Sequence, residues 1–275
     1  MRELAPAKIN LNLYLGPLRG DGRHELLSVM QSITLCDELE MADAERDEVL
    51  CPAVAGPNLA AAALAAFREA TGWDGPRQRI EIVKRIPVAA GMGGGSADAA
   101  AALRLLARRS GLADAALLHE LACALGSDVA GQLQPGRVLV GGGGEQVEPL
   151  PDPPPFGVLV LPSQAMLATA AVYREADRLG LPRSARQLAA LDPLSSVGVN
   201  DLEPASRSLE PSITAELERA REAGANQALV CGSGPTVIGL FDDPLAASRA
   251  AATLTAAGVE AWAARPYPRA LGALS

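Results

Sequence analysis

The chain has few aromatic residues and few lysines. The first shortage limits how its core can be built, and the second singles out the lysines that remain. Its 275 residues include two Trp, three Tyr and three Phe, so its interior must be built mainly from Ala, Leu and Val. Lysine occurs only at Lys8 and Lys84, in a chain that otherwise uses Arg as its cation. A lysine that persists against such a bias is a candidate for a chemically required ammonium group.

A net basic charge, long apolar runs and paired cysteine motifs are also missing. A formal net charge of −8 disfavours nucleic acid and anionic membranes as partners. No run of about 18 apolar residues and no signal-peptide core are present. Cys36, Cys51, Cys123 and Cys231 lack metal-ligand or CxxC spacing, which predicts buried free thiols in a reducing cytosol. We therefore expect a cytoplasmic protein that acts on a small molecule.

Apolar periodicity and turn residues predict an α+β chain of two domains. The chain is 49% hydrophobic, which is enough to bury two cores. Residues 6–15 alternate as a strand that places Lys8, Asn10 and Asn12 on one face. A proline-rich break at 150–157 separates the predicted domains 1–152 and 153–275.

A run of glycines lies between a predicted strand and a predicted Ala-rich helix. The segment from Pro87 to Ala97 reads PVAAGMGGGSA, and Ser96 is expected to cap the helix. Small residues let the backbone approach a phosphate, and a helix N-terminus offers free N–H groups. The segment lacks the Lys of a Walker loop and the third Gly of a dinucleotide fingerprint. It therefore predicts a phosphate cradle of another type, and a plain connection into the helix is the alternative.

Three groups of motifs resemble, in the same order, those of the GHMP kinases, the superfamily of galactokinase, homoserine kinase and mevalonate kinase. They are PAKINLNLYL with DGRHELLSVMQSI, IPVAAGMGGGSADAAAAL with LGSDVAG, and ALVCGSGPTVIGLF. The first group is similar to the branch that phosphorylates a cytidine diphospho-alcohol at its 2-hydroxyl in non-mevalonate isoprenoid synthesis. The resemblance implies a ribosomal-protein-S5-like amino-terminal domain, a ferredoxin-like carboxyl-terminal domain and a site in the cleft between them.

The resemblance also implies which residues carry the reaction. Lys8 and Asp128 match the catalytic pair, in which the Asp takes the proton of the acceptor hydroxyl and the Lys favours the developing alkoxide. ATP with Mg²⁺ is the implied phosphoryl donor, and Ser96 is placed near the metal. Asp98 is interpreted as a first-turn acid matched to the helix dipole. The implied nucleotide loop consists of Pro87, Val88, Ala89, Ala90, Gly91, Met92, Gly93, Gly94, Gly95, Ser96 and Ala97.

The implied acceptor site combines Asn10, Arg23, His24, Thr169 and Tyr173. His24 matches a residue that reads the cytosine edge, and Tyr173 matches an aromatic that stacks on the base. Arg23 replaces the usual Tyr, and its guanidinium either stacks on the base or points at the diphosphate.

Two alternative functions stay open on these residues. One is another small-alcohol kinase of the family, of the homoserine or mevalonate type. The other is a nucleotide-binding protein that no longer transfers phosphate. We expect a monomer or a weak homodimer in either case.

Overall fold

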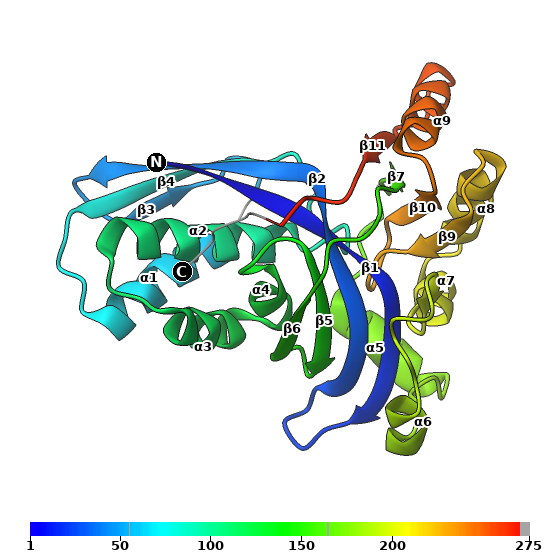
Figure 1. The fold of residues 1–275 in the computed structure, drawn as a ribbon, viewed down its shortest axis with the longest axis horizontal. Helices are drawn as coiled ribbons and strands as arrows, with labels where there is room; N and C mark the ends of the chain where they lie inside the picture. The colour runs from blue at the N-terminus through cyan, green and yellow to red at the C-terminus, as the bar shows by residue number, and fades with distance from the viewer. Residues whose placement is uncertain (55, 164, 270–275) are drawn as a thin grey trace.

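The computed structural model describes residues 1–54, 56–163 and 165–269, which fold around two β-sheets (Figure 1). The larger, seven-stranded sheet has the order β3-β4-β2-β1-β8, and β5 joins it by pairing with β2 and β6. Its strands are β1 (Arg2–Leu18), β2 (His24–Ala44), β3 (Glu48–Leu50), β4 (Arg77–Val83), β5 (Arg137–Gly142), β6 (Gln146–Leu150) and β8 (Val199–Asn200). The sheet is built around one long antiparallel pair, β1 and β2.

Four helices lie on one side of the larger sheet, where the first two contact its strands and the last two pack mainly on other helices (Figure 1). They are α1 (Leu59–Thr71), α2 (Gly94–Ser110), α3 (Ala115–Leu125) and α4 (Ser127–Gln132). Their shared core is made mostly of Ala and Leu, as the shortage of aromatics predicted, and Phe67 is the one phenylalanine in it. Because small side chains line α2, this helix packs closely on the sheet, and the loop before it reaches β1. The Lys8 amide donates a hydrogen bond to the Met92 carbonyl at 3.0 Å.

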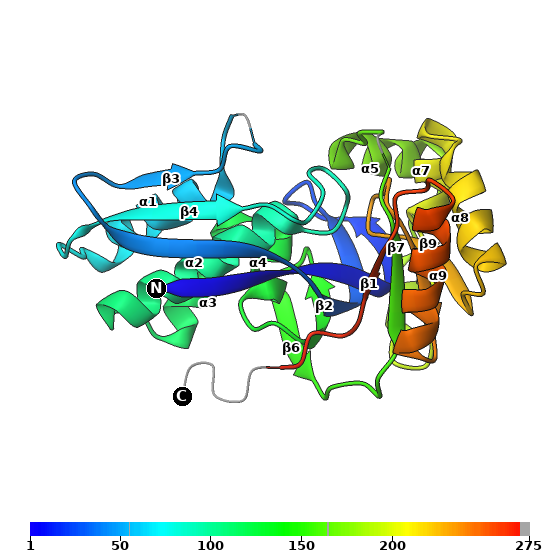
Figure 2. The same cartoon turned by 90° about the horizontal axis from the view of Figure 1, so that it is seen from above.

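The smaller, four-stranded sheet is antiparallel throughout and has the order β11-β7-β10-β9. Its strands are β7 (Gly157–Leu161), β9 (Gln227–Val230), β10 (Val237–Phe241) and β11 (Trp262–Ala264). The helices α8 (Ile213–Glu222) and α9 (Pro244–Ala256) pack against it and form one side of the molecule (Figure 2). This is the βαββαβ order of a ferredoxin-like unit, so the α+β fold prediction is confirmed.

The chain between β7 and β9 returns to the larger sheet. It carries α5 (Thr169–Arg178), α6 (Ala185–Ala189), β8 and α7 (Glu203–Leu209), and β8 pairs in parallel with β1. After β11 the chain runs back across the molecule, and the Tyr267 amide donates to the Ser32 carbonyl (Figure 1). Segments beyond residue 152 therefore join the larger sheet, and the limits 1–152 and 153–275 stay a prediction. Residues 270–275 of the second predicted domain lie outside the described residues.

Candidate active site

A cavity of about 420 Å³ lies where β1, the loop before α2 and the starts of α4 and α5 meet. Residues from all three groups of motifs line it, although they are far apart in the sequence. The lining residues that the argument below uses are Lys8, Asn10, Lys84, the loop 87–96, Asp98, Asp128, Gly144, Thr169, Tyr173, Gly232 and Ser233. The structure thus brings most of the candidate residues to one place.

The glycine loop is held against the turn that follows β9. Gly91 has a φ of 75°, and a Cβ on it would lie 2.4 Å from the Cys231 carbonyl oxygen, so no side chain fits there. The prediction of Ser96 as helix cap is wrong, because α2 begins at Gly94 and Gly93, with a φ of 67°, occupies the cap position. Residues 94–96 therefore carry the first N–H groups of the helix, which have no helical acceptor. These residues line the cavity, as an anion cradle requires.

All loop residues from Pro87 to Ser96 line the cavity, whereas Ala97 does not. Ala97 is 1% exposed and belongs to the core between the helices and the larger sheet. Its contribution is therefore to packing beneath the loop.

Lys8 and Asp128 meet at the middle of the cavity. Lys8 Nζ lies 3.4 Å from Asp128 Oδ2 and donates a hydrogen bond to Asn10 Oδ1 at 2.9 Å. The Lys8 side chain is 5% exposed, whereas that of Asp128 is 40% exposed. Asp128 is the second residue of α4, a short helix that the sequence analysis did not predict. The cation is thus buried behind a carboxylate that is open to the cavity.

The prediction that Lys8, Asn10 and Asn12 share one face of a strand is wrong. The register of β1 against β2 shifts between Asn10 and Asn12, which marks a β-bulge that resets the alternation of side chains. Asn12 is fully buried, and its amide donates to the carbonyls of Pro193 and Ser196. Leu13 lines the cavity in its place.

One end of the cavity, which we call the acceptor end because the predicted acceptor residues Thr169 and Tyr173 line it, is formed by α5 and the turn after β9. Thr169 Oγ1 and Ser233 Oγ are hydrogen-bonded at 3.1 Å. Tyr173 lies one turn further along α5, and burial, together with the nearby charge of Asp128, raises the pKa of its hydroxyl. His24 lies behind Tyr173 with ring centroids 5.7 Å apart, and it does not line the cavity. Its Nδ1 is 2.9 Å from the Gly16 carbonyl oxygen.

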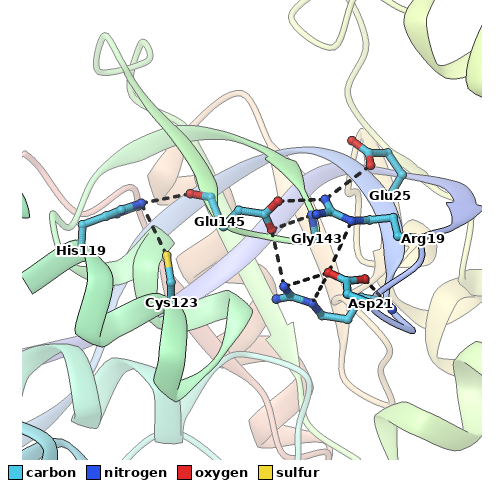
Figure 3. Close-up of polar contacts among 8 residues, drawn as sticks. Arg19, Asp21, Glu25, His119, Cys123, Gly143 and Glu145 are labelled. Carbon is cyan, nitrogen blue, oxygen red and sulfur yellow. Dashed lines mark hydrogen bonds and ion pairs between the residues drawn. The ribbon is translucent and has the colours of Figure 1, made fainter.

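The structure does not bring Arg23 to the cavity lining. Its guanidinium nitrogen NH2 lies 3.1 Å from Asp21 Oδ2 and 4.0 Å from Glu145 Oε2, in the cluster of charged residues drawn in Figure 3. The Arg23 side chain is 49% exposed. Neither a stack on a base nor a contact with a diphosphate is indicated by this position.

A buried triad lies beside the glycine loop, at the end of the cavity that we call the nucleotide end after the predicted role of that loop, and the sequence analysis missed it. Lys84 Nζ lies 2.5 Å from Asp37 Oδ2 and 2.7 Å from Asp98 Oδ2, and all three side chains are at most 7% exposed. Burial, and to a lesser degree Asp37, raises the pKa of Asp98 to about 7 even though Lys84 acts to lower it. Asp98 is thus a hydrogen-bond acceptor of the Lys84 ammonium, and its role is not limited to the helix dipole. The scarcity of lysine was the signal that pointed to Lys84.

Asn200 and Asp201, for which the sequence suggested no role, fix the backbone around the acceptor end. Asn200 Nδ2 donates to the carbonyls of Val230 and Gly232 at 2.8 and 2.7 Å. Asp201 accepts a hydrogen bond from the Leu15 amide at 3.0 Å. The pair therefore ties the turn after β9 to β1.

Three further expectations concern metals, thiols and membranes. Across residues 1–54, 56–163 and 165–269, no group of three or more His, Cys, Asp or Glu side chains is placed to hold a metal ion. The four cysteines are free thiols, as expected, but only Cys36 and Cys231 are buried, and Cys51 and Cys123 are partly exposed. Within the same residues, no helix is both long and apolar enough to cross a membrane.

Comparison with known proteins gives matches along nearly the whole chain. The family descriptions "GHMP kinases N terminal domain" and "GHMP kinases C terminal" match residues 58–136 and 172–260. A protein of Anaeromyxobacter dehalogenans (strain 2CP-C) named 4-diphosphocytidyl-2-C-methyl-D-erythritol kinase is 42% identical over 97% of this chain and 90% of its own length. A protein of the same name from Rhizobium meliloti (strain 1021) is 37% identical, over 92% of this chain and 90% of its own length.

The solved structures agree with these sequence matches. A crystal structure of 4-(cytidine 5'-diphospho)-2C-methyl-D-erythritol kinase aligns with a TM-score of 0.81 at 32% identity, covering 98% of this chain and 100% of that one. Homoserine kinase from Cytophaga hutchinsonii aligns with a TM-score of 0.58 at 18% identity, covering 96% and 95% of the two chains, and so shares the fold.

Proposed function

We propose that this chain, which belongs to the GHMP kinase family, transfers the γ-phosphoryl group of ATP to the 2-hydroxyl of 4-diphosphocytidyl-2-C-methyl-D-erythritol. The relatives that bear this name cover almost the entire chain, the acceptor end of the cavity included. The observation that carries the chemistry is the 3.4 Å contact between Lys8 and Asp128 in a cavity that the glycine loop also lines. The chain is therefore an ATP-dependent kinase of non-mevalonate isoprenoid synthesis.

The loop from Pro87 to Ser96 binds the triphosphate of ATP in this proposal. The N–H groups at the start of α2 supply an anion site without a lysine in the loop. The close contact of Gly91 with the turn after β9 holds the loop in place. Ser96 lines the cavity and would supply a hydroxyl beside a Mg²⁺ ion bound with ATP, which would neutralise phosphate charge. A single hydroxyl fits that role, since Mg²⁺ at such sites is held mainly by phosphates and water with one or two protein oxygens.

Asp128 accepts the proton of the acceptor hydroxyl as that oxygen bonds to the γ-phosphorus and ADP leaves. Its carboxylate is open to the cavity, so a hydroxyl can reach it. Lys8 stabilises the negative charge that develops on the acceptor oxygen, and Asn10 holds the Lys8 ammonium in place at 2.9 Å. Phosphoryl transfer asks a protein mainly for such alignment and charge.

The acceptor binds against Tyr173, Thr169 and Asn10. Tyr173 offers a ring for stacking on the cytosine from the cavity side, and His24 fixes the tilt of that ring from behind. Thr169 and its partner Ser233 offer hydroxyls at the same end. Location in the cytoplasm and a monomeric or weakly dimeric state stay predictions.

An ADP-release assay with three alcohols tests this function. We expect turnover with 4-diphosphocytidyl-2-C-methyl-D-erythritol and at least about a hundredfold lower kcat/KM with mevalonate or homoserine, because neither fills a base site. Preference for one of these alcohols would assign the chain to another branch of the family. ATP binding without release of ADP from any of the three would identify a nucleotide-binding protein that has lost its activity.

A further inference from the structure

A network of ion pairs joins two turns that lie next to the acceptor end of the cavity (Figure 3). One turn, residues 19–23, connects β1 to β2, and the other, residues 142–145, connects β5 to β6. Arg19 NH1 lies 2.8 Å from Glu145 Oε1 and 3.5 Å from Glu25 Oε2, and Arg19 Nε lies 3.5 Å from Asp21 Oδ2. Glu145 is thus the carboxylate that links the second turn to the first.

The glycines of the second turn make room for this contact. A Cβ on Gly142 would lie 2.4 Å from Glu145 Oε1 and 3.0 Å from Arg19 NH1, and the φ of Gly142 is 66°. Glu145 Oε2 accepts a hydrogen bond from the Gly143 amide at 2.8 Å. Partial burial acts to raise the pKa of the Glu145 carboxyl, but the hydrogen bonds from its own amide, from Arg19 and from the Gly143 amide, together with the charge of Arg19, outweigh burial and lower that pKa. The carboxylate therefore holds its own turn and the neighbouring turn at once.

The backbone of the same turn rests on the helices that carry Asp128. A Cβ on Gly144 would lie 2.4 Å from the Cβ of Ser127, the residue before Asp128, and Gly144 itself lines the cavity. The Glu145 carbonyl oxygen lies 3.1 Å from His119 Nε2 on α3 (Figure 3). A displacement of the turn would therefore remove the packing that holds the start of α4.

We propose that Glu145 is a positioning residue of the kinase: its carboxylate clamps the 142–145 turn onto the 19–23 turn, and Gly144 in turn fixes Ser127 and Asp128 at the acceptor end. This inference rests on the proposed function. It also gives Arg23 a place, since its guanidinium packs 3.2 Å from a Cβ position on Gly143 and belongs to the clamp, not to the base site. Side chains of the network are about one-third exposed, so salt should weaken the clamp.

The test compares Glu145→Gln with Glu148→Gln, an exposed glutamate on β6 of the same hairpin. Steady-state kinetics of Glu145→Gln should show about a fivefold higher acceptor KM with the ATP KM changed less than twofold, an effect of the size that a networked, partly buried ion pair gives. The acceptor KM of the wild type should rise with ionic strength and that of Glu145→Gln should not. The effect of Arg19→Gln combined with Glu145→Gln should be smaller than the sum of the two single effects, because both single variants remove the Arg19–Glu145 contact. Arg19→Gln alone should be at least as harmful as Glu145→Gln, because it also removes the ion pairs with Asp21 and Glu25.

Hydrogen exchange in the absence of substrates keeps this test independent of the acceptor's identity. Amides in peptides that cover 126–132 and 142–146 should exchange faster in Glu145→Gln than in wild type, and at the wild-type rate in Glu148→Gln. An unchanged exchange rate of residues 126–132 in Glu145→Gln would contradict the clamp. Equal increases of the ATP KM and the acceptor KM in this variant would contradict it too. A wild-type protein inactive on every alcohol would defeat the proposed function, and the exchange result would still decide whether Glu145 holds Ser127 and Asp128.

Discussion

The two ends of the cavity are built in different ways. The nucleotide end consists mostly of one continuous stretch, residues 84–98. This stretch contributes backbone N–H groups, glycines and two members of the buried triad, Lys84 and Asp98. The acceptor end collects side chains from β1, α4, α5 and the turns after β5 and β9. In the proposed function, a triphosphate is recognised through backbone that a local sequence can specify, whereas an alcohol with a base attached needs side chains brought together by the whole fold.

The largest effect is expected at Asp128, where loss of catalysis can be measured separately from loss of ATP binding. Asp128→Asn should lower kcat by about 10² to 10⁴, the usual loss for a positioned base. Its ATP affinity should stay within about twofold of the wild type, since Asp128 lies outside the glycine loop. Stopped-flow ADP release and calorimetry of ATP binding measure the two quantities. Near-wild-type turnover in a folded variant would remove Asp128 from the mechanism.

A second prediction contrasts the two candidate walls of the base site. Tyr173→Ala should raise the acceptor KM by about tenfold to a hundredfold with little change in the ATP KM, because stacking of a base on an aromatic ring contributes about 1–3 kcal/mol. Arg23→Ala should raise the acceptor KM by no more than about fivefold, as loss of one clamp contact does. An Arg23→Ala effect as large as that of Tyr173→Ala would place the guanidinium against the substrate.

A third prediction concerns the close backbone approach at the nucleotide end. Gly91→Ala should destabilise the protein by about 1–3 kcal/mol beyond the cost of a positive φ and should raise the ATP KM, because its Cβ meets the Cys231 carbonyl. Gly111→Ala is the matched control, since Gly111 has a φ of 69° but no atom within 4 Å of a Cβ. Urea unfolding of both variants separates the clash from the strain. Equal losses would mean that the loop does not depend on this contact.

These contrasts also show what the sequence could and could not specify. Strands and helices with clear periodicity were predicted, and so was the glycine loop, because its chemistry is local. The bulge between Asn10 and Asn12 was not predictable, since it depends on how β1 pairs with β2. The ion pairs of Lys84 with Asp37 and of Glu145 with Arg19 join residues far apart in the chain, so no local sequence pattern predicts them.

The smallest expected effect comes from the buried charges of the nucleotide end. The pKa of Asp98 is raised to about 7 by burial, from an ordinary value of 3.8, so the folded state favours the protonated carboxyl. Stability from this preference is fully present below the unfolded pKa and is lost as the pH rises through the folded pKa. The wild type should therefore lose stability relative to Asp98→Asn as the pH rises from about 4 to 7. Each 1 kcal/mol of that loss lowers the Tm of the wild type by about 2–4 °C. Above this range the difference in Tm between the two proteins should stay constant.

Asp43→Asn serves as the control for this titration. The hydrogen bond from Gln78, followed by that from Arg109, lowers the pKa of Asp43, so the stability that Asp43 contributes is lost only as the pH falls through that lowered pKa. The difference in Tm between Asp43→Asn and the wild type should stay constant between pH 5 and 8. A difference for Asp98→Asn that grows toward low pH would show that Asp98 is ionised throughout, with Lys84 as the dominant influence.

The most direct measurement of the central claim follows the label of γ-³²P-ATP into product with the wild-type enzyme, Mg²⁺ and 4-diphosphocytidyl-2-C-methyl-D-erythritol. The account predicts that the label enters a phosphomonoester on the 2-oxygen of the acceptor, that the cytidine diphosphate bond stays intact, and that one ADP forms for each ester. Label found only in inorganic phosphate or in a cytidine nucleotide would contradict it, since the acceptor hydroxyl would then not be the nucleophile that Asp128 and Lys8 serve.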